Sequence, residues 1–385
     1  MPKIDAFFKF MVENGSSDLH MAVGAPPMIR QSGEMRPIKF KELTSEGNKI
    51  MFYEILNDVQ RETFEKRGDL DFAYEIEGLA RFRGNLFMQR KGPSAVFRII
   101  PSTVLSAQQL NLPESVLRFA KLHKGMVLVT GPTGSGKSTT LAAIIDHINE
   151  TRRDHILTVE DPIEFVHKNK RCLVNQREVK VHTESFASAL KGALRQDPDI
   201  ILVGEMRDLE TIELACTAAE TGHLVFGTLH TISAPKTVDR LINVFPMGQQ
   251  DQIRMMLSES VKGVVSQTLC KKKGGGRVAA LEIMYVTSAI ANLIREGKTF
   301  QLKSSIQTGR SQGMQTIDQA LMDLLQSEQI EIEEAMNHAQ EKKLFEGYLA
   351  QKPKERPTLR TMPGSQDAGT IKKPEVEQVT KRPGT

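Results

Sequence analysis

Residues 127–146, VLVTGPTGSGKSTTLAAIID, hold the side chains of this 385-residue chain that point most clearly to chemistry. An apolar run stops at a glycine-rich turn, and a helical pattern follows Lys137 and Ser138. The spacing fits GxxxxGK[ST], in which backbone N–H groups surround a phosphate, the lysine reaches the β- and γ-phosphate oxygens, and the hydroxyl can ligate Mg²⁺. The sequence therefore predicts a nucleotide-binding loop made of Gly131, Pro132, Thr133, Gly134, Ser135, Gly136, Lys137, Ser138 and Thr139.

Two other apolar segments end in carboxylates. HILTVEDPIEF (155–165) places Glu160 and Asp161 at a strand end, and DPDIILVGEMRD (197–208) places Glu205 after an apolar run and Gly204. Ends of neighbouring parallel strands meet at one edge of a sheet, so one carboxylate can polarise an attacking water and another can hold the magnesium shell. Each acid taken alone could also be a solvated loop residue or a helix N-cap, and Glu205 stands where such runs usually carry aspartate.

Two histidines flank a further predicted strand in ETGHLVFGTLHT (220–231). Their spacing of seven residues is too long for both to bind one metal ion on a straight strand. His230, at the carboxyl end, is placed to touch the γ-phosphate or its water, whereas His223 lies at the opposite end. The alternative for both is a structural histidine that caps a turn.

Three arginines of the N-terminal region form a second basic set. In GLARFRGNLFMQR (78–90), the two-residue period of a strand puts Arg81 and Arg83 on one face and Phe82 on the other, and Arg98 lies on the next strand. They are either surface charges and sheet ion pairs, or residues that reach a γ-phosphate as arginine fingers do. In the second case nucleotide would pull two domains, or two subunits, together.

Composition narrows the function classes. Lys and Arg number 51 against 47 Asp and Glu, there is no Trp, and there are four Tyr. Near-neutral charge and scarce aromatic residues argue against a nucleic-acid motor on the same fold. Cys172, Cys216 and Cys270 lie far apart, so neither a disulfide framework nor a zinc ribbon is indicated, and we expect reduced, mostly buried thiols. No apolar run reaches the length of a spanning helix, and we expect a cytoplasmic protein.

Hydrophobic periodicity predicts the supporting elements. Residues 1–100 should form a small α/β domain, with a helix near the start, a hairpin over 28–38 that turns at Ser32-Gly33, and one helical stripe over 44–66. Three antiparallel strands with turns at Glu77-Gly78 and Gly92-Pro93 should complete it.

The remaining residues predict a second domain. We expect a linker and helix over 101–122 and an ATPase domain over 123–348, whose strands at 126–130, 155–160, 200–204 and 223–229 alternate with helices and so form a mainly parallel sheet. CKKKGGGR (270–277) should be a hairpin tip. Residues 349–385, rich in proline and charge, should be a disordered tail.

Four motifs together resemble a known family. GPTGSGKST, TVEDPIEF, VGEMRDLET and ETGHLVFGTLHT, in this order, closely resemble the Walker A, Asp box, Walker B and His box of secretion ATPases. Within them the chain looks like the type IV pilus retraction ATPases of the PilT/PilU family. GSSDLHM (15–21), RFRGNLFMQR (81–90) and GMQTIDQALMDLL (313–325) extend the match over nearly all of residues 1–345. The chain lacks the zinc-binding cysteine cluster of the assembly-type relatives, which favours retraction.

This resemblance implies an α/β protein in which a RecA-like P-loop ATPase domain follows a smaller PAS-like domain. It implies a homo-hexamer that binds ATP and Mg²⁺ and drives an inner-membrane pilus platform protein from the cytoplasmic side, without contact to nucleic acid. Mapped on this sequence, Glu160 would be the general base, Glu205 the Walker B acid beside Ser138 at the metal, and His230 a phosphate contact. Arg81, Arg83 and Arg98 would be the basic residues that meet nucleotide.

Two alternatives stay open. The family's AIRNLIRE-like motif reads AIANLIRE at 289–296, with Ala291 where arginine is expected. That change fits a PilU-like accessory motor that works with a paralogous retraction ATPase. A nucleotide-gated scaffold with slow hydrolysis is the second alternative.

Overall fold

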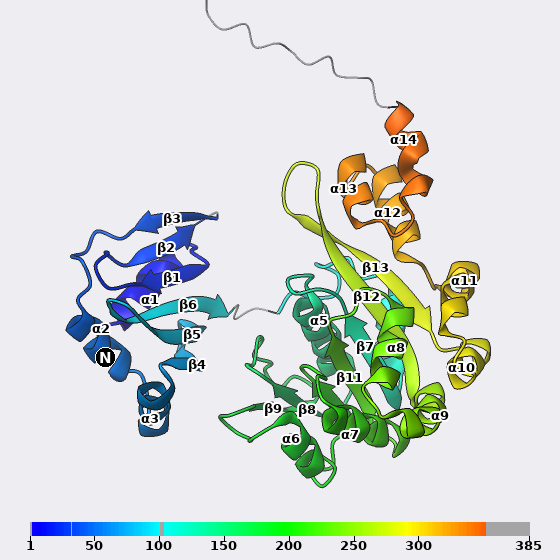
Figure 1. Ribbon diagram of the computed structural model, residues 1–385, viewed down its shortest axis with the longest axis horizontal. Coiled ribbons are helices and arrows are strands. Elements are labelled where there is room, and N and C mark those ends of the chain that lie inside the picture. Colours follow the sequence, from blue (N-terminus) through cyan, green and yellow to red (C-terminus); the bar gives the residue numbers. More distant parts are fainter. Residues whose placement is uncertain (1, 32, 101–103, 352–385) are drawn as a thin grey trace, which may run out of the picture.

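The N-terminal part of the chain is built on an antiparallel sheet (Figure 1). The structure is a computed structural model that describes residues 2–31, 33–100 and 104–351. Within these residues, six strands pair in the order β3-β2-β1-β6-β5-β4. Their bounds are β1 Asp18–Met21, β2 Met28–Gln31, β3 Glu34–Pro37, β4 Asp69–Ile76, β5 Ala80–Gln89 and β6 Gly92–Ile100.

In the described part of this domain, three helices pack beside the sheet: α1 Asp5–Glu13, α2 Ser45–Tyr53 and α3 Asp58–Arg67. Its core is aromatic, and Phe8 stacks on Phe82 with ring centroids 4.3 Å apart. Phe82 is fully buried while Arg81 and Arg83 on either side of it are not, so the predicted two-residue alternation of this strand is confirmed.

The single helical stripe predicted over 44–66 is wrong, because the chain breaks between α2 and α3. Asn57 caps α3 in a capping box with Gln60, in which each side chain bonds the other residue's backbone N–H. Such a box starts a new helix. Two apolar residues of the supposed stripe therefore face solvent: Ile50 is 46% exposed and Val59 is 73% exposed.

The turns of the sheet agree with the prediction in two places out of three. The 28–38 hairpin is confirmed, and Gly33 has a left-handed φ of 88°. The β4–β5 turn at 77–79 is confirmed too. The turn predicted at Gly92-Pro93 lies instead at 90–91, because Gly92 pairs with Gln89 inside the β5–β6 ladder.

The second domain has a seven-stranded sheet within the described residues, in the order β13-β12-β7-β11-β10-β8-β9. The predicted parallel arrangement is confirmed, and only the β12–β13 hairpin is antiparallel. The strands are β7 Gly125–Thr130, β8 His155–Glu160, β9 Leu173–Glu178, β10 Ile200–Val203, β11 Leu224–Leu229, β12 Val261–Lys271 and β13 Arg277–Tyr285. CKKKGGGR forms the tip of that last hairpin, as predicted.

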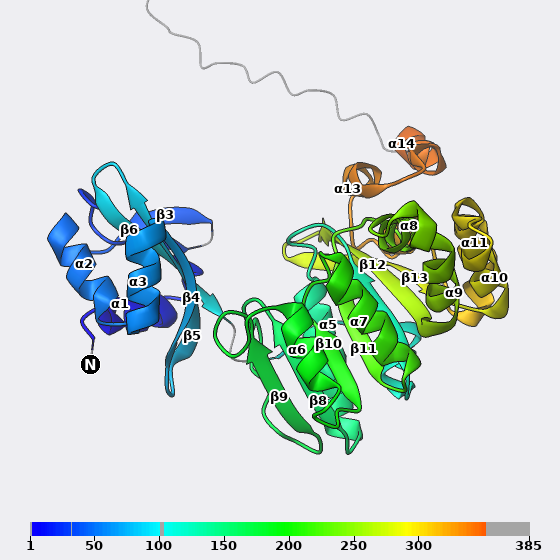
Figure 2. The same ribbon diagram turned by 60° about the horizontal axis from the view of Figure 1, so that its bottom comes forward.

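Helices cover both faces of this sheet (Figure 2). Along β7, Met126 and Leu128 pack in the core with one group of helices, whereas Val127 and Val129 pack against α5. A strand buried on both faces reads as a continuous apolar run, which is why the sequence identified it. The helices are α5 Lys137–Thr151 on one face and α6 Phe186–Ala193, α7 Leu209–Glu220, α8 Ala234–Asn243 and α9 Gln250–Ser260 on the other.

The chain after β13 is helical, as predicted. The helices are α10 Ser288–Arg295, α11 Leu302–Thr308, α12 Ile317–Gln326, α13 Ile332–His338 and α14 Glu346–Gln351. We expected a disordered tail over 349–385, but α14 continues to Gln351, and residues 352–385 lie outside those described.

The segment between the domains ends in a short helix, α4 Glu114–Leu117, followed by a 3₁₀ turn, Arg118–Lys121. This matches the helix expected at the end of the linker, while residues 101–103 are not described. Among residues 2–31, 33–100 and 104–351, none of the helices combines the length and apolar character that crossing a bilayer requires.

Candidate nucleotide-binding site

The glycine-rich loop lies between β7 and α5, where the sequence predicted it. Gly131 has a φ of 147°, and a Cβ there would lie 2.3 Å from the backbone oxygen of Gln267. Gly136, with a φ of 88°, sits at the N-cap of α5. At these two positions the backbone adopts conformations that residues with a Cβ rarely adopt. The loop leads into the positive N-terminal end of α5, which attracts phosphate.

Lys137 begins that helix with a buried side chain. Its Nζ donates to the carbonyl oxygens of Gly131 at 2.8 Å and of Pro132 at 3.0 Å. Burial lowers the pKa of Lys137, with Glu205 and Glu164 opposing that effect. The ammonium group is thus held over the loop by carbonyl oxygens that a phosphate can replace.

Gln267 on β12 supports the loop from behind. Its Nε2 donates to the Ser135 carbonyl oxygen at 2.7 Å, and its Oε1 accepts from Thr140 Oγ1 at 2.8 Å. One buried side chain therefore joins the loop to the first turn of α5. Sequence reasoning missed Gln267, because the residues around it show only the pattern of a buried strand.

Glu160 stands at the end of β8 in a network of donors. Its Oε1 accepts from Thr158 Oγ1 at 2.7 Å and from Gln176 Nε2 at 3.2 Å. Its Oε2 accepts from the Glu164 backbone N–H at 3.3 Å. Burial raises the pKa of Glu160 above its ordinary value, although these hydrogen bonds oppose the rise. A carboxyl with a raised pKa is a better proton acceptor than an ordinary one.

Glu205 and His230 follow the neighbouring strands β10 and β11. The Nε2 atom of His230 lies 2.9 Å from Glu205 Oε1, and Arg207 Nε lies 2.5 Å from that same oxygen. Burial of the Glu205 carboxylate alone would raise its pKa, but the bonded Arg207 and then His230 outweigh burial and hold the pKa below its ordinary value. Arg207 stands inside the VGEMRD motif, yet the sequence reading gave it no role.

One cavity of about 540 Å³ brings the predicted groups together. The strand ends converge as parallel topology requires, since Val159 of β8 pairs with Val203 of β10. The predicted residues that line the cavity are Thr133, Gly134, Gly136, Lys137, Ser138, Thr139, Glu160, Glu205, His230, Arg83 and Arg98.

Two of the three arginines reach this cavity from the N-terminal domain. Arg83 and Arg98 are direct cross-strand partners on β5 and β6, so like charges stand side by side. Arg98 Nε is also held by Asp18 Oδ1 at 2.7 Å. Two adjacent cations facing a site are favourable when an anion binds between or beside them.

The remaining predicted residues lie elsewhere. Arg81 donates to Glu178 of β9 and is not among the residues that line the cavity. Pro132 and Ser135 border a neighbouring hollow together with His338. His223 Nδ1 lies 3.0 Å from the Ala218 carbonyl oxygen, which is the turn-capping role that the sequence left open.

The cavity also supplies donors suited to a hard cation. Ser138 and Glu205 bring a hydroxyl and a carboxylate to it, and Glu160 and Asp161 line the same space. Oxygen ligands of this kind, used together with substrate phosphates, are those that Mg²⁺ prefers. The donor set therefore fits magnesium.

Comparison with known proteins agrees with this geometry. The family model described as "Type II/IV secretion system protein" matches residues 2–350. The type IV pilus retraction ATPase PilT of Pseudomonas aeruginosa is 56% identical over 336 residues, which cover 87% of this chain and 98% of that protein. PilU of the same organism, a type IV pilus ATPase, is 39% identical over 338 residues, which cover 88% of each chain.

A solved structure supports the same assignment. The crystal structure of the pilus retraction motor PilT with bound ADP superposes with a TM-score of 0.84 at 46% identity, covering 90% of this chain and 99% of that one. The described fold, a RecA-like P-loop ATPase domain preceded by a smaller PAS-like α/β domain, is thus found in a nucleotide-binding relative. The chain belongs to the Type II/IV secretion system family and, within it, to the PilT/PilU family of type IV pilus retraction ATPases.

Proposed function

We propose that this chain is a motor ATPase that hydrolyses ATP to power the retraction of type IV pili, the process behind twitching motility. One observation carries the proposal: a phosphate loop, two strand-end carboxylates and a histidine border the same cavity as two arginines of the other domain. Phosphate-binding and water-activating groups on one side, and movable cations on the other, are what a mechanochemical ATPase needs.

The loop binds the triphosphate. Backbone N–H groups and the N-terminus of α5 hold the β-phosphate, and the Lys137 ammonium exchanges its two carbonyl partners for β- and γ-phosphate oxygens. Binding therefore places the γ-phosphate toward the strand ends, where the carboxylates stand.

Glu160 acts as the general base. It takes a proton from water as the water oxygen bonds to the γ-phosphorus and the bond to the bridging oxygen of ADP breaks, which gives ADP and inorganic phosphate. Its raised pKa supports this role, and the Thr158 and Gln176 hydrogen bonds fix the direction of its carboxylate.

Ser138 and Glu205 would hold Mg²⁺, which when bound supplies positive charge beside the phosphates. His230 shares the Glu205 oxygen with Arg207 and thus orients that carboxylate. From the same position at the end of β11, the imidazole can donate to the γ-phosphate.

Arg83 and Arg98 make the site respond to nucleotide. Both belong to the N-terminal domain, so their attraction to the γ-phosphate draws that domain toward the ATPase domain, and loss of the γ-phosphate releases it. Arg81 reaches the ATPase domain at a different point, on Glu178. Hydrolysis is then coupled to the relative position of the two domains.

The motor works as a homo-hexamer on the cytoplasmic side of the inner membrane, where it turns a pilus platform protein. Family resemblance is the main support. Large exposed apolar side chains add to it, since such groups often mark contacts between subunits: Met247 is 91% exposed, Phe300 77% and Val59 73%.

A PilU-like accessory motor is the second candidate. The observation in its favour is Ala291 on α10, at the position where the retraction motif carries arginine. Identity of 56% to PilT against 39% to PilU favours the autonomous motor.

The test combines hydrolysis in vitro with retraction in cells. The full chain should hydrolyse ATP in a Mg²⁺-dependent way, and Lys137→Ala should abolish turnover while the circular dichroism spectrum is kept. In cells without the gene, surface fibres should no longer shorten. Normal turnover in Lys137→Ala, or bound ATP that stays intact in a single-turnover assay, would overturn the motor and support a nucleotide-gated scaffold. Retraction that needs this chain only when a paralogue is present would identify an accessory motor.

A further inference from the structure

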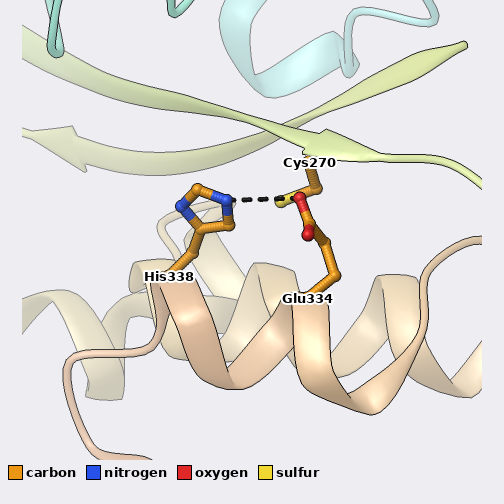
Figure 3. Close-up of side chains that lie close together, drawn as sticks. All are labelled: Cys270, Glu334 and His338. Carbon is orange, nitrogen blue, oxygen red and sulfur yellow. Dashed lines mark hydrogen bonds and ion pairs between the residues drawn. The ribbon is translucent and has the colours of Figure 1, made fainter.

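Cys270, Glu334 and His338 lie close together (Figure 3). Glu334 and His338 border the same hollow as residues 132–135 of the nucleotide-binding loop. The cysteine comes from β12, and the other two residues come from α13. Their ligand atoms all lie within 4.8 Å of one another, and no other trio of His, Cys, Asp or Glu meets that condition among the described residues. We propose that these three side chains bind a zinc ion that ties the C-terminal helices to the strand supporting the loop.

Secondary structure sets the convergence. Glu334 and His338 are four residues apart on α13, so they lie one above the other on the same face of the helix. Alternation along β12 turns Gln267 and Leu269 toward the loop, and Thr268 and Cys270 toward the C-terminal helices. The facing helix and strand thus present nitrogen, oxygen and sulfur to one point.

The spacing suits a small cation. In a tetrahedral zinc site with bonds of about 2.0–2.3 Å, ligand atoms lie roughly 3.5 Å apart. His338 Nε2 is already 3.3 Å from Glu334 Oε1. Small rotations of these side chains would bring the sulfur to the same separation.

Neighbouring groups orient two of the ligands. Thr268 Oγ1 lies 3.3 Å from Nδ1 of His338, which leaves Nε2 to face the other ligands. The backbone N–H of Lys271 donates to Glu334 Oε1 at 2.7 Å. Contacts of this kind fix the ring and the carboxylate in metal sites, and their loss commonly weakens metal binding.

Charge and access also favour a cation. Cys270 is fully buried, while Glu334 and His338 are partly exposed and border a hollow of about 440 Å³ through which an ion can arrive. A cation that replaces the thiol proton would compensate the negative charge which burial otherwise disfavours.

The donor set selects the metal. One thiolate, one imidazole and one carboxylate match zinc, whereas Mg²⁺ and Ca²⁺ prefer oxygen ligands alone. Three protein ligands leave the fourth position to water. The ion would link α13 to β12 three residues from Gln267, the residue that supports Ser135 of the loop.

The test uses the full chain, freed of metal with a chelator and kept without nucleotide, and titrates it with Co²⁺, a coloured substitute for zinc. One equivalent per chain should give the near-ultraviolet absorption of a cobalt thiolate, and Zn²⁺ should displace it. Cys270→Ser should abolish the band. Cys172→Ser and Cys216→Ser are matched controls, because both cysteines are also free and buried, and both should keep it.

His338→Gln is a second variant that changes a partly exposed side chain and therefore keeps the test valid if Cys270→Ser fails to fold. It should weaken Co²⁺ and Zn²⁺ binding by roughly tenfold or more, with an unchanged circular dichroism spectrum. The proposal is overturned if the folded wild-type chain gives no thiolate band, if the band survives in Cys270→Ser, or if His338→Gln binds as tightly as wild type. None of these readouts depends on ATP hydrolysis.

Discussion

Arg81 of the N-terminal domain and Glu178 of β9 form an ion pair that joins the two domains, with 2.5 Å between Nη2 and Oε2. The Glu178 side chain is 3% exposed and that of Arg81 is 16% exposed. Glu178 also accepts from the Ile163 backbone N–H at 3.2 Å. The pair is thus shielded from water and held on the ATPase side, so it acts as a specific contact between the domains rather than as a mobile surface charge.

Arg81→Met should loosen this contact. The change leaves the buried Glu178 carboxylate without its cation, and uncompensated buried charges are costly. We expect cleavage by a protease in the connecting segment 104–113 to become at least ~10-fold faster. Among the residues that the structure describes, the one other ion-pair partner of Arg81 is Glu75, 4.0 Å away.

A double-mutant cycle provides the control. Arg81→Met and Glu178→Gln should be coupled by about 1–3 kcal/mol, whereas Arg98→Met and Glu178→Gln should be additive because Arg98 pairs with Asp18. Unchanged cleavage in Arg81→Met would show that the ion pair does not hold the domains together.

The role of Glu160 as general base determines how the rate of ATP hydrolysis should depend on pH. A general base works only when deprotonated, so the rate rises with pH as Glu160 loses its proton. Because burial raises the pKa of Glu160, the acidic limb of kcat/KM should lie above the ordinary glutamate range. Thr158→Val removes a hydrogen bond that lowers this pKa, so the limb should move to still higher pH.

Thr217→Val is the matched control, because the Thr217 hydroxyl bonds only a backbone oxygen within its own helix among the contacts described. It should leave the pH profile in place, and Glu160→Gln should lower kcat by roughly 10²–10⁴-fold across the whole range. If the acidic limb of the kcat/KM profile does not move in Thr158→Val, Glu160 is not the general base.

Gln267 on strand β12 should affect the affinity for nucleotide, because its hydrogen bonds hold the loop. Gln267→Leu leaves the Ser135 carbonyl and the Thr140 hydroxyl without their buried partner. We expect this to lower the free energy of unfolding by about 2 kcal/mol. Since both groups shape the loop, we also expect ADP binding, measured by calorimetry, to weaken about tenfold, a loss of ~1.4 kcal/mol.

Gln315→Leu separates the two effects. Gln315 Nε2 donates to the Leu281 carbonyl at 2.7 Å, away from the loop, so its loss should lower stability to a similar degree while ADP affinity stays unchanged. Equal ADP affinities in wild type and Gln267→Leu would mean that the loop keeps its shape unaided.

What the sequence predicted well was fixed by local rules. The phosphate loop has a fixed spacing, and the carboxylates at 160 and 205 follow apolar runs whose parallel pairing brings their ends together. The break before α3 could have been predicted too, since Asn57 and Gln60 have the spacing of a capping box.

Other features depend on contacts between distant segments. Gln267 lies 132 residues from Ser135, and Glu178 lies 97 from Arg81, so no local pattern connects them. The cluster of Cys270 with Glu334 and His338 depends in the same way on how α13 packs against β12. The cysteine spacing considered in the sequence could not indicate a site to which only one cysteine contributes.

A Cβ atom at position 131 should destabilise the protein more than a Cβ atom at position 134 of the same loop. In Gly131→Ala the new Cβ would lie 2.3 Å from the Gln267 backbone oxygen and 2.6 Å from Ser135 Oγ, so the strand or the loop must shift. In Gly134→Ala the φ is also positive, at 78°, but nothing lies within 4 Å, and only backbone strain of about 1 kcal/mol remains. The free energy of unfolding without nucleotide should therefore fall by about 3 kcal/mol or more in Gly131→Ala and by much less in Gly134→Ala. If the free energy of unfolding falls equally in the two variants, backbone strain, and not contact with β12, is the reason why position 131 requires glycine.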